Sequence, residues 1–216
     1  MRSRTETALD LSLYVVTHPA RSRGRSHEEM TVAALAGGAT VIQLRDKNAS
    51  TLDLYKAALR MSALCAEAVA LFIVNDRLDI ALAVGAGVHL GQDDIPADVA
   101  RRLLGPGKVL GVSVENAEQA RKASSDGADY VAIGPIYEAR GTKADAGAPV
   151  GAAAVTALRP AMGLPIVAIG GIKHQHIAEI ITAGAAGAAV VSAIVSAEDV
   201  TNATREMKRL IVEARG

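Results

Sequence analysis

The chain has 216 residues, half of them hydrophobic, and its formal net charge is zero. This length can bury one substantial core, and the hydrophobic fraction argues against disorder. Zero net charge and scarce aromatic residues argue against nucleic-acid and anionic-membrane partners. Glu6 and Asp10 interrupt any apolar signal region near the N-terminus. We therefore expect a cytoplasmic protein with a single domain over residues 1–216.

Eight short β-rich runs alternate along the chain with helix-like stretches. Their bounds are Ser12–Thr17, Thr40–Arg45, Leu71–Asn75, Gly87–Gly91, Val109–Ser113, Tyr130–Gly134, Ile166–Gly170 and Ala188–Ser192. Helical spacing of apolar residues is clearest over 52–66 and 202–215. The uncharged stretch 180–197 is interpreted as a helix end, a turn and a buried strand, because glycines divide it. Strands alternating with helices predict parallel pairing through right-handed crossovers, and eight such units predict an α/β fold, a single-domain (β/α)8 TIM barrel.

In such a barrel the active site lies at the C-terminal ends of the strands, which directs attention to the residues there. Gln43, Arg45 and Lys47 alternate around the end of the second run. Period-two spacing puts Gln43 and Arg45 on one strand face, the inward face of a barrel. An anionic ligand would satisfy these cations. The alternative is that Arg45 pairs with a structural carboxylate while Lys47 is solvated.

Acidic residues follow the third and fourth runs. Asn75 and Asp76 end one, and Asp93 and Asp94 follow the other. Two carboxylates one strand spacing apart repel each other unless a cation lies between them, and Mg²⁺ commonly binds one or two carboxylates, waters and substrate phosphates. The acidic residues after these two runs therefore indicate a candidate Mg²⁺ site. The alternative for Asp76 is capping of the next helix.

Glycines and small residues follow the last two runs. Gly170 and Gly171 end the seventh, and Val191 and Ser192 end the eighth. The loops after these two strands often bind phosphate in TIM barrels, although simple tight turns would use the same glycines. The loop after the sixth run, 138–143, ends in Thr142 and Lys143, and reads equally as a lid or as a solvated loop.

Together these residues indicate a binding site for a diphosphate with Mg²⁺ near strands two to four and a binding site for a monophosphate near strands seven and eight. No Ser-His-Asp arrangement is present, so charge stabilisation of a departing diphosphate fits best. Cys65 lies in a helical pattern and is interpreted as a buried structural thiol. His89 is interpreted as a core histidine with satisfied hydrogen bonds, and no zinc site is assigned.

Several motifs, read in order, resemble the thiamine-phosphate synthase family. The resemblance runs from about residue 14 to 194 and rests on Tyr14-Val-Val-Thr17, Gln43-Leu-Arg-Asp-Lys47, Val74-Asn-Asp-Arg77, Gly87-Val-His-Leu-Gly-Gln-Asp-Asp94, Leu110-Gly-Val-Ser113, Asp129-Tyr-Val-Ala-Ile-Gly-Pro135 and Ala168-Ile-Gly-Gly-Ile172. It implies a (β/α)8 barrel that joins an aminopyrimidine diphosphate to a thiazole phosphate. Diphosphate would leave first, and the thiazole nitrogen would capture the resulting pyrimidine-methyl cation.

The resemblance also implies roles for individual residues. Asp76 and Asp94 match the Mg²⁺ ligands. The positions that match those holding the pyrimidine diphosphate are Gln43, Arg45, Lys47, Asn75, Ser113 and Lys143, of which Arg45, Lys47, Ser113 and Lys143 are the expected catalytic residues. Those that match the thiazole-phosphate positions are Thr142, Gly171, Val191 and Ser192. The implied partners are these two small-molecule substrates, and a homo-oligomer is compatible with the sequence.

Three departures from the family pattern stand out. His18 occupies the place of an aspartate, and one residue is missing between Ala86 and Gly87. The loop 138–143 is one residue longer than usual and lacks a threonine at Ala139. Because Arg140 stands beside that position, we expect it to substitute in holding the thiazole phosphate.

Other functions remain as alternatives. A thiazole tautomerase-like isomerase on the same barrel would have no diphosphate to release, so a complete diphosphate set argues against it. A non-enzymatic phosphate-binding sensor would need no Mg²⁺ ligands. A phosphate-binding barrel from amino-acid biosynthesis is the most distant alternative.

Overall fold

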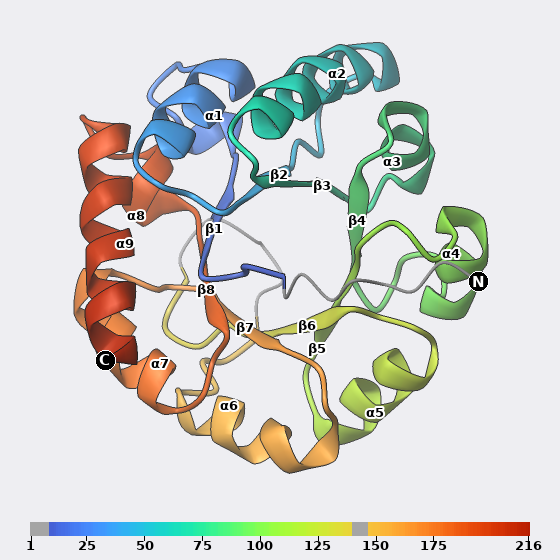
Figure 1. Ribbon diagram of the computed structural model, residues 1–216, viewed down its shortest axis with the longest axis vertical. Coiled ribbons are helices and arrows are strands. Elements are labelled where there is room, and N and C mark those ends of the chain that lie inside the picture. Colours follow the sequence, from blue (N-terminus) through green and yellow to red (C-terminus); the bar gives the residue numbers. More distant parts are fainter. Residues whose placement is uncertain (1–8, 140–146) are drawn as a thin grey trace.

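The computed structural model describes residues 9–139 and 147–216. Its strands form a closed parallel barrel in which each strand pairs with its sequence neighbour and β8 pairs with β1 (Figure 1). The strands are β1 (Leu13–Val16), β2 (Val41–Leu44), β3 (Leu71–Asn75), β4 (Gly87–Leu90), β5 (Leu110–Val114), β6 (Tyr130–Ile133), β7 (Ile166–Ile169) and β8 (Gly187–Val190). The predicted (β/α)8 barrel is confirmed.

Most strand bounds differ slightly from the predicted ones. β5 begins and ends one residue later than predicted, and Ser192 begins a helix instead of ending β8. Several predicted strands include polar residues that follow the apolar run, whereas ladder hydrogen bonds stop where the chain turns away from its neighbour. The stretch 180–197 contains a helix end, a turn and buried β8, as predicted, and also a helical turn over Ser192–Val195 that was not predicted. In the described part of the chain no helix is long and apolar enough to cross a membrane.

Helices surround the barrel (Figure 1). They are α1 (His27–Ala36), α2 (Thr51–Glu67), α3 (Leu78–Val84), α4 (Ala97–Leu104), α5 (Ala117–Ser125), α6 (Ala153–Leu158), α7 (Ile177–Thr182), α8 (Ser192–Val195) and α9 (Val200–Arg215), with short 3-10 turns at Pro19–Arg21, Arg159–Ala161 and His174–His176. Side-chain caps begin several of them. At α1 the Ser26 hydroxyl accepts from the Glu29 amide while the Glu29 carboxylate accepts from the Ser26 amide.

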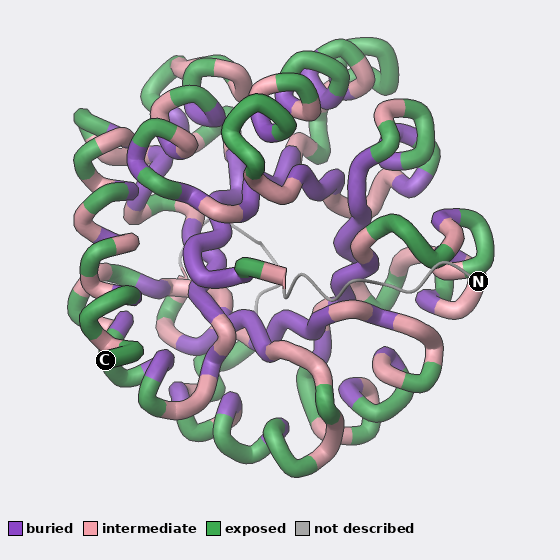
Figure 2. Tube along the Cα trace, viewed as in Figure 1, coloured by how far each residue is buried: buried purple, intermediate pink, exposed green. Residues whose placement is uncertain are grey.

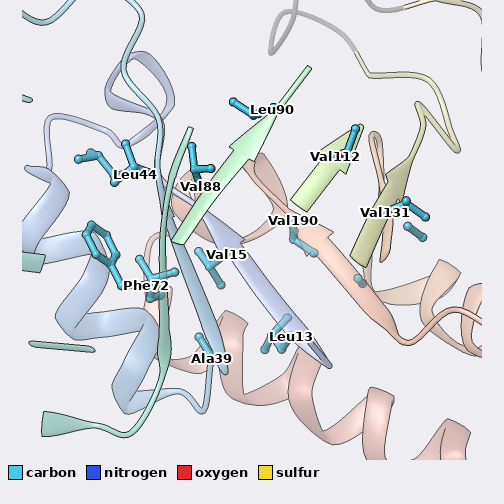
Figure 3. Packing of buried hydrophobic residues seen from close by; sticks show 14 of the residues in the cluster. Leu13, Val15, Ala39, Leu44, Phe72, Val88, Leu90, Val112, Val131 and Val190 are labelled. Carbon is cyan, nitrogen blue, oxygen red and sulfur yellow. The ribbon is translucent and has the colours of Figure 1, made fainter. Parts of the chain in front are cut away.

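The strands divide the core into two layers. Alternate residues such as Leu13 and Val15 face the helices and join the large outer cluster shown in Figure 3. The residues between them, such as Tyr14 and Val16, face the barrel interior. Figure 2 shows the buried ring of strands inside a ring of helices whose outer faces are exposed. Both strand faces are buried, which explains the near-continuous apolar runs in the sequence.

The barrel interior is filled at its N-terminal end and open at the other. Leu11, in the segment entering β1, packs with Tyr14, Val41, Ile73 and other members of the inner cluster. These side chains fill the N-terminal part of the barrel interior, whereas the C-terminal ends of the strands border a cavity.

Candidate active site

A cavity of about 610 Å³ opens at the C-terminal ends of the strands. Ten of the predicted site residues line it: Gln43, Arg45, Lys47, Asn75, Asp76, Asp94, Ser113, Gly171, Val191 and Ser192. The other three, Arg140, Thr142 and Lys143, lie outside the described residues. Ala139 and Gly147, which flank that gap, also line the cavity.

The cations at the end of β2 lie at the cavity rim. Arg45 is half-buried and Lys47 is exposed. The Lys47 Nζ lies 3.8 Å from the Asp76 Oδ2. Asp46, between them in sequence, has a different role, because its carboxylate accepts from the Asn48 and Ala49 amides. This turn leaves Arg45 and Lys47 on the cavity side.

The Asp76 carboxylate is held over the cavity by its backbone. Asp76 has a φ of 59°, in the left-handed region, and its amide donates to the His89 carbonyl at 2.9 Å. Aspartate tolerates this conformation better than most residues. No side-chain cap is made at the start of α3, whose N-cap is Arg77, so the capping alternative for Asp76 is wrong.

The second carboxylate of the pair is Asp94, whose Oδ2 accepts from the Gly91 amide at 2.6 Å. Burial, and then the neighbouring Asp94 carboxylate, raise the pKa of Asp76 to about 6, partly offset by Lys47 and Arg45. Two carboxylates in contact favour a cation between them. Among the described residues no group of three or more His, Cys, Asp or Glu side chains could hold a metal ion. The Asp76 and Asp94 carboxylates would suit a Mg²⁺ ion that takes its remaining ligands from water and a substrate.

Packing against the chain after β6 favours glycine at positions 170 and 171, in addition to any bound ligand. Their φ angles are 95° and 66°. A Cβ on Gly170 would lie 2.6 Å from the Pro135 Cα, and one on Gly171 would lie 2.6 Å from the Glu138 carbonyl oxygen. The chain after β6 continues alongside them, since the Tyr137 amide donates to the Gly170 carbonyl at 3.0 Å. These glycines let the segment after β6 border the cavity.

The eighth strand leads directly into α8, a single helical turn. Val191 is its N-cap and Ser192 its first residue. The first amides of a helix have no acceptor within it, which suits an anionic group. Val191 and Ser192 thus form the cavity wall beside Gly171.

Buried polar side chains form the cavity floor. The Gln43 Nε2 donates to the Tyr14 hydroxyl at 2.7 Å, and the Tyr14 and Tyr130 hydroxyls lie 2.8 Å apart. The His89 Nδ1 lies 2.9 Å from the Tyr130 hydroxyl and its Nε2 lies 2.9 Å from the Ser113 Oγ. Burial lowers the pKa of His89 to about 4, so its ring is neutral near pH 7. The prediction of a satisfied core histidine is confirmed.

Sequence reasoning missed the two tyrosines. Tyr14 and Tyr130 lie 116 residues apart, and each sits among apolar residues in its strand. Two signals pointed to them: both stand in the motifs that carry the family resemblance, and their even spacing from Val16 and Ala132 puts them on the inward face of their strands. Cys65 is buried, as predicted, and burial raises the pKa of its thiol to about 12.

Comparison with known proteins agrees with this architecture. The family model described as thiamine monophosphate synthase matches residues 13–194. The chain belongs to this family. It is 52% identical to the thiamine-phosphate synthase of Chloroflexus aurantiacus over 204 residues, which cover 94% of each chain. It is 49% identical to that of Moorella thermoacetica over 205 residues, covering 94% of this chain and 97% of the other.

A solved structure is also similar. The thiamine phosphate pyrophosphorylase of Pyrococcus furiosus superposes with a TM-score of 0.88 at 38% identity, covering 96% of this chain and 98% of that one. A 3-hexulose-6-phosphate synthase superposes with a TM-score of 0.62 at 19% identity, which shows a shared fold alone. The resemblance inferred from the sequence motifs is thereby confirmed.

Proposed function

We propose that the cavity catalyses the Mg²⁺-dependent joining of an aminopyrimidine-methyl diphosphate to a thiazole phosphate, yielding thiamine phosphate and diphosphate. Membership of the family makes the protein a thiamine-phosphate synthase, a transferase acting on small molecules. The proposed reaction is supported by one observation. A single cavity has paired carboxylates and cations on the β2–β4 side and glycines and a helix start on the β7–β8 side.

The diphosphate belongs on the β2–β4 side. Arg45 and Lys47 would bind its oxygens, and Lys143 would join them from the loop after β6. Asp76 and Asp94 would hold Mg²⁺, which supplies charge neutralisation to the diphosphate when bound. Asn75 lines the same part of the cavity. Gln43 and Ser113 lie on the floor, where they would meet the pyrimidine ring.

The reaction exchanges one bond for another. The bond between the methylene carbon and the diphosphate oxygen breaks, and its electron pair leaves with the diphosphate. The lone pair of the thiazole nitrogen then forms the new carbon–nitrogen bond, so the positive charge moves to the thiazolium. The side chains of Arg45 and Lys47 stabilise the charge that develops on the leaving oxygen, and the cavity positions the two rings.

The thiazole phosphate belongs on the β7–β8 side. The backbone around Gly171, Val191 and Ser192 would bind its phosphate, because helix-start amides suit anions. Arg140 and Thr142 would complete this site from the loop after β6. One cavity with an anion-binding region on each side suits a substrate pair with one anionic group at each end, which an isomerase or a sensor does not need.

The test is a coupling assay with purified protein that measures diphosphate release. Both substrates with Mg²⁺ should give release, and omission of either substrate or addition of a chelator should abolish it. Asp76→Asn should lose activity by about a hundredfold or more while remaining folded. Conversion of a thiazole isomer without diphosphate release would instead support the tautomerase-like alternative. A cytoplasmic location and self-association stay predictions.

A further inference from the structure

The polar side chains on the cavity floor form one continuous chain, which we call the polar chain: Gln43, Tyr14, Tyr130, His89 and Ser113. Four contacts of 2.7–2.9 Å connect them. Only its two end members are among the predicted substrate residues. The three central members are 2%, 0% and 8% exposed, so bulk water does not compete for their hydrogen bonds.

The direction of these hydrogen bonds follows from counting protons. The Gln43 amide donates to the Tyr14 oxygen, so the Tyr14 proton goes to Tyr130. The Tyr130 proton then goes to the His89 Nδ1. A neutral ring that accepts at Nδ1 carries its proton on Nε2, which donates to Ser113. The Ser113 hydroxyl proton remains available for a ligand, and so does the Gln43 carbonyl oxygen.

The reverse direction requires every member to change together. If the Gln43 amide turned over, Tyr14 would donate to it, Tyr130 to Tyr14, His89 Nδ1 to Tyr130, and Ser113 to His89 Nε2. Gln43 would then offer a donor and Ser113 only an acceptor. The two ends of the polar chain are therefore coupled, and each direction presents the opposite pattern to the cavity.

We propose that Tyr14, Tyr130 and His89 are positioning residues that fix an acceptor at Gln43 and a donor at Ser113, and so select a 4-aminopyrimidine over a 4-oxopyrimidine. The inference rests on the proposed function. A 4-aminopyrimidine offers an exocyclic N–H donor and a ring nitrogen acceptor, which complement this pattern. A 4-oxopyrimidine offers a carbonyl acceptor and a ring N–H donor, so its carbonyl oxygen meets the Gln43 carbonyl oxygen and the Ser113 hydroxyl proton loses its acceptor on the ring.

A second feature of the fold supports a fixed Tyr130. Its ring lies against Gly111 of β5, where a Cβ would come within 2.1 Å of the Tyr130 Cζ. The His89 ring stacks on it with centroids 5.6 Å apart. Glycine at this place in the strand thus makes room for the tyrosine that joins the two halves of the polar chain.

The test compares binding of two probes, the 4-amino and the 4-oxo forms of 2-methylpyrimidine-5-methyl diphosphate, by calorimetry with Mg²⁺ and without the thiazole. Wild type should prefer the amino form by about a hundredfold or more. Tyr130→Phe removes the central hydroxyl, so the preference for the amino form should fall at least about tenfold. Leaving one buried polar group without a hydrogen-bond partner changes an affinity by about that factor. The affinity for inorganic diphosphate and the thiazole-phosphate KM should not change.

The control is Tyr55→Phe, the same substitution in α2 outside the barrel, which should keep the wild-type preference. Tyr14→Phe interrupts the polar chain at a second place and replaces Tyr130→Phe if that variant does not fold. A general structural defect would weaken all probes together and leave the ratio intact. An unchanged ratio in a folded variant, or a wild type that prefers the oxo form, overturns the inference. The proposed function fails separately, by absence of diphosphate release from wild type.

Discussion

At the scale of single residues, the site depends on side chains whose neighbours determine their chemistry. Asp46 and Asp76 are both aspartates at strand ends. The Asp46 carboxylate is held by the amides of its own turn, and hydrogen bonds from Asn48 and His27 keep its pKa below the ordinary value despite burial. Asp76 faces Asp94 and has a raised pKa. The first carboxylate therefore stabilises a turn, and the second is suited to a cation.

Arg45→Lys tests whether the guanidinium binds the leaving diphosphate. Arginine presents two parallel donors where lysine presents a single charge, so the substitution should lower kcat by about tenfold or more, a loss of about 1.4 kcal/mol. Steady-state kinetics with the pyrimidine diphosphate as the varied substrate would measure it. Arg121→Lys, an exposed change on α5, is the control and should behave as wild type. If the Arg45→Lys variant had the same kcat and KM as wild type, this role for Arg45 would be ruled out.

At the scale of elements, the junction between β7 and the segment after β6 determines the shape of the cavity wall. Pro135–Tyr137 runs beside Gly170 through two backbone hydrogen bonds, with Ile136 donating to Ile169 at 2.9 Å and Tyr137 to Gly170 at 3.0 Å. This contact leaves no space for a Cβ on Gly170 or on Gly171. The segment that leads into the loop after β6 is therefore positioned by the end of β7.

Gly170→Ala should separate these segments. The new methyl group would overlap Pro135, and the residue would keep an unfavourable positive φ, so we expect a loss of about 2–4 kcal/mol in the free energy of unfolding. Urea denaturation would measure it. Gly107→Ala is the matched control, because a Cβ there meets nothing within 4 Å, and it should change stability by less than about 0.5 kcal/mol. Equal stability of the two variants would show that the wall tolerates the contact.

At the scale of the whole molecule, a buried histidine and a half-buried aspartate give the barrel opposite responses to acid. The pKa of His89 falls from its ordinary 6.5 to about 4 in the fold, so the unfolded chain binds its proton first. Stability from His89 is complete above pH 6.5 and is lost as the pH falls toward 4. The pKa of Asp76 rises from 3.8 to about 6, so the folded chain gains stability as the pH falls through 6.

Two variants separate these contributions. In chelator, His89→Gln should be less sensitive than wild type to acid between pH 6.5 and 4, with a difference on the order of 3 kcal/mol across that range. Asp76→Asn should be more sensitive than wild type over the same range. Urea denaturation at successive pH values would measure both. Parallel stability curves for His89→Gln and wild type would show that burial does not keep this ring neutral.

The order of strands and helices, the closed barrel and nine of the cavity residues could be predicted from the sequence, because inward faces and strand ends follow from a period of two and from small or polar residues after apolar runs. The place of Ser113 in the site was implied by the family resemblance. The sequence left open whether Asp76 caps a helix and why residue 170 is a glycine. Both answers depend on contacts between neighbouring strands, where Asp94 lies beside Asp76 and Pro135 lies against Gly170. The contact of Tyr14 with Tyr130 is of the same kind. It joins residues 116 positions apart that only a closed barrel brings face to face.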